Sequence, residues 1–183
     1  MKSLKTILLL TITLEVTACA QIKQVAQGPA VNAIDNTTAL PTGTYFIVNA
    51  GGGALNPLNP GVGENVFLRP FTKSGVQKWQ ITQHKTTKGA LSYTISLKGS
   101  DNLYFQPYAV KDHTPVISPR SNGTSFKITA AGSPKLWYIK SMLYNGDALR
   151  SFVYSPNLPT EIRFEAAENT DKFLWKLVPA EAN

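Results

Sequence analysis

The chain has 183 residues, 16% of them charged, and a formal net charge of +7. This length allows one ordinary domain with appendages, and the plentiful aromatic and β-branched residues, with 13 Gly and 12 Pro spread along the chain, argue against a disordered or long-helix protein. The single cysteine excludes an internal disulfide, so the fold must depend on its apolar core.

The N-terminus carries an export signal. Lys2 and Lys5 precede an apolar run, residues 7–14, that is too short to span a bilayer, which needs about 20 residues. The small residues 16–18 before Cys19 resemble the lipobox of bacterial lipoproteins. In that family the signal is cleaved before the cysteine, which then carries the acyl chains. We therefore predict a signal peptide over residues 1–18 and lipidation at Cys19; a plain secretory signal is the alternative.

Residues 19–41 are predicted to be the lipidated cysteine and a flexible tether, because residues 20–40 are polar and lack periodicity. The position after the cysteine is Ala20 rather than Asp, which in lipoproteins favours sorting to the outer membrane. The resemblance thus implies a bacterial cell-envelope protein, membrane-bound through its lipid. Its basic residues are scattered rather than clustered, which argues against a nucleic-acid partner.

Four landmarks recur in the same order in three segments between residues 42 and 180. Each segment opens with an aromatic and an aliphatic residue two apart: Tyr45/Ile47, Tyr93/Ile95 and Trp137/Ile139. A small-residue turn leads to a leucine: Leu55, Leu103 and Leu149. An alternating segment follows: Val66/Leu68, Val116/Ser118 and Ile162/Phe164. Each closes on an aromatic and an aliphatic: Trp79/Ile81, Phe126/Ile128 and Trp175/Leu177. This order indicates an internal threefold repeat.

A spacing of two is the period of a β-strand and places both side chains of a pair on one face. Each repeat therefore predicts about four short strands separated by turns. Three such units must close on themselves or leave exposed edges, and a barrel with a hairpin cap achieves closure. We predict an all-β fold, a β-trefoil of three pseudo-repeats over residues 42–180, with Trp79, Phe126 and Trp175 in its core. A β-sandwich would show no threefold pattern.

The first repeat resembles the ricin-B-type lectin repeat. The likeness rests on Gly43-Thr-Tyr-Phe-Ile, Ala54-Leu55, Val66-Phe-Leu-Arg-Pro70 and the Gln77-x-Trp79 signature. It covers residues 43–179. The same skeleton is similar to the fungal trefoil peptidase inhibitors. These resemblances imply a binding protein for either a glycan or a protein.

The lectin resemblance implies a sugar site built from an Asp after the leucine, an aromatic platform, and an Asn or Gln near the Gln-x-Trp signature. The position after the leucine is held by Asn56, Tyr104 and Arg150, so no repeat has the Asp. The signature glutamine is kept only at Gln77. If one site survives, we expect it in the first repeat, from Asn56, Gln77 and a ring such as Phe67 or Phe71.

The inhibitor resemblance is matched by two proline-rich loops. Asn56-Pro-Leu-Asn-Pro60 and Ser155-Pro-Asn-Leu-Pro159 flank the apolar tips Leu58 and Leu158. Proline restrains the backbone, so such a loop loses little entropy when it docks against a protein. The alternative is that both loops are ordinary turns between strands.

The sequence has few residues and motifs that are suited to catalysis. His84 and His113 both fall in predicted turns, and a general base needs a partner and a protected site. The sequence has no nucleophile elbow, paired His-Glu motif or phosphate-binding loop. Structural zinc needs four clustered ligands, which are also missing. We therefore predict a non-enzymatic protein with no metal and no cofactor.

Overall fold

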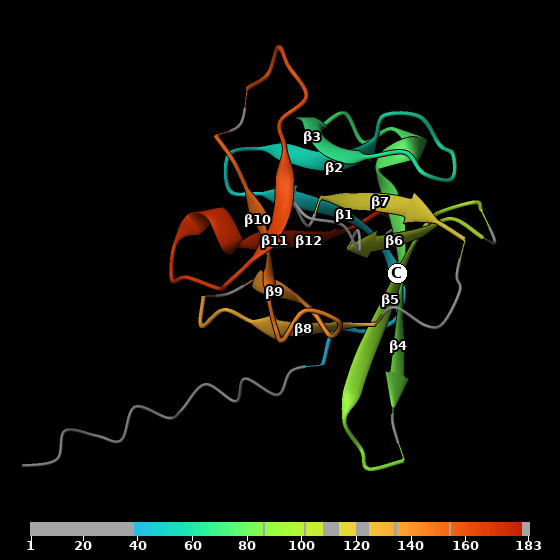
Figure 1. The fold of residues 1–183 in the computed structure, drawn as a ribbon, viewed down its shortest axis with the longest axis vertical. Coiled ribbons are helices and arrows are strands. Elements are labelled where there is room, and N and C mark those ends of the chain that lie inside the picture. The colour runs from blue at the N-terminus through green and yellow to red at the C-terminus, as the bar shows by residue number, and fades with distance from the viewer. Residues whose placement is uncertain are drawn as a thin grey trace, which may run out of the picture. The chain divides into compact units, whose positions relative to one another are not determined.

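Twelve β-strands make up nearly all the regular structure in the part of the chain described by the computed structural model, residues 39–85, 87–100, 102–107, 114–119, 125–133, 135–153 and 155–180 (Figure 1). The strands are β1 (Gly43–Asn49), β2 (Gly53–Pro57), β3 (Val66–Pro70), β4 (Lys78–Lys85), β5 (Leu91–Leu97), β6 (Tyr104–Pro107), β7 (Pro115–Ser118), β8 (Phe126–Ala130), β9 (Leu136–Ser141), β10 (Ala148–Ser151), β11 (Ile162–Glu165) and β12 (Trp175–Pro179). Two 3₁₀ turns, η1 (Gly75–Gln77) and η2 (Asp171–Phe173), precede β4 and β12.

Six of the strands form a closed ring. Going round it, β1 pairs with β4, β4 with β5, β5 with β8, β8 with β9, β9 with β12, and β12 returns to β1, all antiparallel. The other six form three hairpins, β2–β3, β6–β7 and β10–β11. The second strands of these hairpins contact one another and cap one end of the ring. The predicted β-trefoil is therefore confirmed. All the pairs that close the ring lie within residues 39–180, so this part of the chain contains the complete barrel.

Equivalent aromatic pairs fix the register of all three repeats. The opening aromatic of each repeat lies directly opposite its closing aromatic, in the pairs Tyr45–Trp79, Tyr93–Phe126 and Trp137–Trp175. The three closing rings are fully buried, as predicted for the core. Trp79 and Trp175 also donate their indole N–H groups to the carbonyl oxygens of Leu55 (3.1 Å) and Leu149 (2.8 Å). Each indole thus ties the barrel to the cap hairpin of its own repeat.

Phe105 of β6 lies at the centre of the core. Its ring centroid is 5.7 Å from that of Trp79, 5.6 Å from Phe126 and 6.1 Å from Phe164. These separations are typical of favourable aromatic pairs. The core thus joins side chains from all three repeats.

The predicted alignment of the second repeat is wrong in its hairpin. The buried pair Phe105–Ile117 matches Leu55–Leu68 in the first repeat and Leu149–Phe164 in the third. Phe105, not Leu103, is therefore the inward residue. Ile117 replaces the predicted Val116/Ser118 pair, because a slip of one residue moves a strand's side chains to the opposite face.

The segment before β1 packs against the core at the uncapped end of the barrel. Leu40 is 4% exposed and belongs to the main core cluster, although the sequence assigned it to the tether. Its backbone N–H donates to the Tyr93 hydroxyl (3.1 Å), and the Tyr45 hydroxyl donates to the carbonyl of Pro41 (2.9 Å). Burial raises the pKa of both tyrosines, so the Tyr45 hydroxyl keeps the proton that it donates.

The revised register of the second hairpin makes a testable prediction. Phe105→Ala should lower the free energy of unfolding by about 3–5 kcal/mol, because it removes a fully buried ring from the centre of the core. Leu103→Ala should cost clearly less, because Leu103 is only partly buried against that core. Urea unfolding of both variants checks this, and a larger loss for Leu103→Ala would contradict the register.

Candidate functional site

The outward face of the cap differs between the repeats. The residues after the inward leucine or phenylalanine are Asn56, Gln106 and Arg150, so Gln106 and not Tyr104 matches Asn56. Across each hairpin they face Phe67, Val116 and Arg163. An aromatic ring, an aliphatic side chain and a guanidinium thus occupy equivalent positions on three strands that contact one another.

A pocket of about 430 Å³ lies where these three hairpins meet. The first repeat contributes Gly63, Asn65 and Phe67, the second Thr114 and Val116, and the third Glu161 and Arg163. We call this the cap pocket. Backbone pairing draws its walls together: Asn65 bridges to Val116, and Leu68 bridges to Thr160 next to Glu161. The pocket therefore combines an aromatic ring, an amide, a hydroxyl, a carboxylate and a guanidinium.

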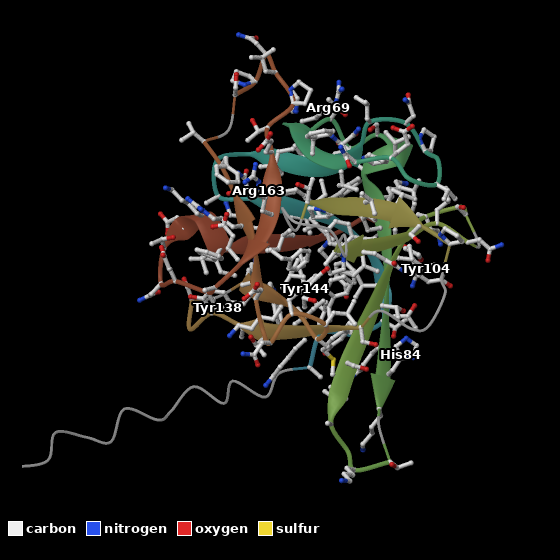
Figure 2. All side chains as sticks on the ribbon, viewed as in Figure 1. Arg69, His84, Tyr104, Tyr138, Tyr144 and Arg163 are labelled. Carbon is white, nitrogen blue, oxygen red and sulfur yellow. The ribbon has the colours of Figure 1, made fainter. Side chains whose placement is uncertain are left out.

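Arg163 is held in place on this pocket by its neighbours. Its Nη2 donates to Glu161 Oε2 at 3.0 Å, and its guanidinium lies 5.4 Å from the Phe152 ring centroid. Arg150 stacks on the same ring at 4.7 Å and pairs with Glu165. The Nε of Arg163 is buried and finds no hydrogen-bond partner among the described residues. Figure 2 shows Arg163 on β11 and Arg69 on β3, two strands that contact each other in the cap.

Of the predicted sugar-binding residues, only one lines the cap pocket. Phe67 lines the cap pocket. Asn56 lies opposite Phe67 on the neighbouring strand, but it is 8% exposed and its Nδ2 donates to the carbonyl of Pro57 at 2.6 Å. Phe71 packs edge-on against Phe46, 5.1 Å between centroids, away from the pocket lining.

Gln77 has a structural role. It is 1% exposed, its Nε2 donates to the carbonyl of Pro70 at 2.7 Å, and its Oε1 accepts from both the backbone N–H (3.0 Å) and the hydroxyl (3.2 Å) of Thr72. These bonds close the loop between β3 and β4. Phe173 occupies the matching position before β12 and is equally buried, so a ring there replaces the amide.

Sequence reasoning missed Asn65, Glu161 and Arg163. The lectin resemblance implies a site within one repeat, whereas the pocket takes residues from all three. The signal available in the sequence was the alternation along residues 162–165, in which Arg163 and Glu165 follow the core residues Ile162 and Phe164. That pattern places Arg163 on the outer face but not beside Phe67.

Both predicted docking tips are exposed. Leu58 is 47% exposed and Leu158 is 67% exposed. Each has an exposed valine on the same loop, Val62 at 62% and Val153 at 85%. Each loop therefore presents two exposed aliphatic side chains to solvent.

The described residues contain no group of three or more His, Cys, Asp or Glu side chains placed to hold a metal. None of their helical turns has the length and apolar character needed to cross a membrane. His84 lies in β4 rather than in the predicted turn, and its Nε2 bonds the Thr94 hydroxyl at 2.9 Å. Cys19, His113 and the predicted signal and tether up to residue 38 lie outside the described residues.

Solved structures share this fold. The chain is similar to ThreeFoil, a designed threefold-symmetric protein (TM-score 0.63, 16% identity, 74% of this chain and 97% of that one). It is similar to the Rhizoctonia solani agglutinin (0.62, 19%, 77% and 97%). It is also similar to the Macrolepiota procera ricin B-like lectin, solved with lactose (0.59, 17%, 78% and 99%). At these identities the likeness is one of fold.

No protein-family model and no curated protein matches the sequence. The resemblance to ricin-B-type β-trefoil domains is confirmed at the level of the fold, which these structures and the closed strand ring share.

Proposed function

We propose that this chain is a non-enzymatic glycan-binding protein whose site is the cap pocket. The observation that carries the proposal is that Phe67, Asn65, Glu161 and Arg163 converge from separate repeats on one pocket of about 430 Å³. That volume lies within the range of small-molecule sites. The lactose-bound lectin of the same fold adds support.

The residues of the cap pocket suit a sugar. The apolar face of a pyranose ring stacks on an aromatic side chain such as Phe67. A carboxylate accepts hydrogen bonds from adjacent hydroxyls, and charged partners strengthen such bonds. Glu161 would serve in this way, while Asn65 and Arg163 donate. Arg163 already lies 3.0 Å from Glu161, so both groups are oriented before a ligand arrives.

We also propose that the bound glycan is not cleaved. Glycoside hydrolysis in most families requires two carboxylates flanking the scissile bond. Among the described residues that line the pocket, Glu161 is the single carboxylate.

The glycan proposal predicts a loss on substitution within the pocket. Phe67→Ala and Glu161→Gln should each weaken retention on the best-bound glycan of an array by about tenfold or more, because each removes a stacking surface or a charge-assisted hydrogen bond. The matched control is Glu165→Gln, whose carboxylate pairs with Arg150 and does not line the pocket. Retention of no glycan by the parent chain, or full retention by both variants, would overturn the proposal.

We further propose that lipid on Cys19 holds the domain at the bacterial cell envelope, at the outer membrane. The support is the lipobox resemblance and a chain of about 20 residues between Cys19 and Leu40. A flexible segment of that length has a root-mean-square span of about 25 Å. The domain would therefore stay close to the membrane surface.

The anchor has its own test. Cys19→Ser should move the protein from the membrane fraction to the soluble fraction, because stable anchoring depends on the acyl chains. Cell fractionation with metabolic labelling by a fatty acid measures both properties. Unchanged partitioning, or labelling that survives the substitution, would refute lipidation at this position.

A second candidate function is docking to a protein such as a peptidase, and the exposed loop tips favour it. Leu58 and Leu158 each share a loop with a second exposed aliphatic residue, Val62 or Val153. Either loop could place an apolar tip in a groove of a partner.

The docking alternative predicts inhibition of a peptidase. The chain should slow at least one member of a panel of serine and cysteine peptidases, and Leu58→Ala or Leu158→Ala should weaken that inhibition by about tenfold, as expected for a central interface side chain. Met142→Ala, also exposed but in the β9–β10 turn, is the control. No inhibition across the panel would remove this candidate.

A further inference from the structure

A groove of about 910 Å³ lies at the uncapped end of the barrel, away from the hairpins. Its walls are the segment before β1 and the facing parts of β9 and β12. The lining is mainly apolar, with Leu40, Leu136, Trp137 and Val178 among its members. We call it the basal groove.

The basal groove lies where the pairing of β9 with β12 ends. In the first repeat Gly43 pairs with Ile81, so β1 and β4 stay together to the end of the strand. The matching residues of the third repeat, Lys135 and Leu177, are not paired, and the β9–β12 register ends at Leu136. Lys135, the residue before β9, has a φ of 68°. The strand pair β9–β12 of the third repeat thus ends one residue earlier than the matching pair β1–β4 of the first repeat.

Trp137 differs from the other two tryptophans. Trp79 and Trp175 are fully buried, whereas Trp137 is partly exposed and lines the groove. Its ring provides a large apolar contact surface that is accessible from solvent. The chain has three tryptophans, so solvent quenching of its fluorescence reports mainly on this groove.

The charge of the basal groove has one sign. Lys135 and Lys176 are exposed and line it, and no acidic residue lines it in the part of the chain that the structure describes. The cap pocket, by contrast, contains the opposed pair Glu161 and Arg163. An apolar floor beneath two ammonium groups complements a ligand with a hydrocarbon chain and an anionic head.

We propose that the basal groove binds one acyl chain of an anionic lipid, with Lys135 and Lys176 contacting its charged head group. Charge complementarity selects the anion, and the apolar lining selects the hydrocarbon. Leu40, the residue through which the chain enters the barrel, forms part of the same wall. This site is separate from the cap pocket and does not depend on glycan binding.

The test uses residues 20–183 and monomeric short-chain lipids. Dioctanoyl phosphatidylglycerol, kept below its micelle concentration, should protect Trp137 from acrylamide quenching in a saturable way. Dioctanoyl phosphatidylcholine should bind about tenfold more weakly, because its head group carries no net charge to pair with the lysines. Glycerol phosphate, which lacks acyl chains, should give no protection.

Charge reversal separates the groove from general electrostatic attraction. Lys135→Glu with Lys176→Glu should weaken phosphatidylglycerol binding by about tenfold or more. The matched control is Lys73→Glu with Lys172→Glu, which changes the net charge equally at exposed sites outside the groove; Lys73 shares the positive φ of Lys135. Circular dichroism should show both variants folded.

Three results would overturn the proposal. Equal binding of the two lipids would remove the role of the lysines. Equal loss in both double variants would indicate attraction by net charge alone. Failure of monomeric lipid to protect Trp137, including the case in which only a peptide or a neutral glycan protects it, would show that the groove has another occupant or none.

Discussion

Closure of the six-stranded ring is the constraint on which the rest of this structure depends. The last strand, β12, must return to β1 in a register that also satisfies β9. That register is set by three aromatic pairs, one per repeat, whose closing rings are completely buried. A ring of strands has no free edge, and each buried aromatic removes roughly 150–250 Å² from water. Because the whole chain has one cysteine, no internal disulfide can add to the stability that this burial provides.

Inward positions are restricted by packing, which leaves the outward positions of the repeats free to differ. Trp79, Phe126 and Trp175 are all aromatic, whereas the outward residues Phe67, Val116 and Arg163 have nothing in common. A symmetric scaffold can therefore carry an asymmetric site. The cap pocket is an example, because each repeat contributes different side chains to one cavity.

The two ends of the barrel present contrasting chemistry. The cap pocket is polar and holds a carboxylate beside a guanidinium, which suits hydroxyl-rich ligands. The basal groove is apolar with two lysines, which suits an amphiphile with a negative charge. The described chain enters the domain beside the groove, at Leu40. The two proposals depend on separate residues.

Sequence alone was enough to establish the threefold repeat, the all-β fold and the three core aromatics, because strand period and burial act locally and leave a pattern that repeats. It could not establish the register of the second hairpin, where the turn at 98–103 is longer than the turn at 50–52 of the first repeat, so that the inward residue is Phe105 and not Leu103. Phe67, one of the predicted ligand-binding residues, lines a pocket, whereas the side-chain amide of Gln77 forms its hydrogen bonds within its own loop. Asn65, Glu161 and Arg163 are brought together only when the first and third repeats pack against each other in the cap, and the basal groove is lined by the segment before β1 together with β9 and β12. Both features arise from contacts between distant segments, and such contacts leave no periodic trace in the chain.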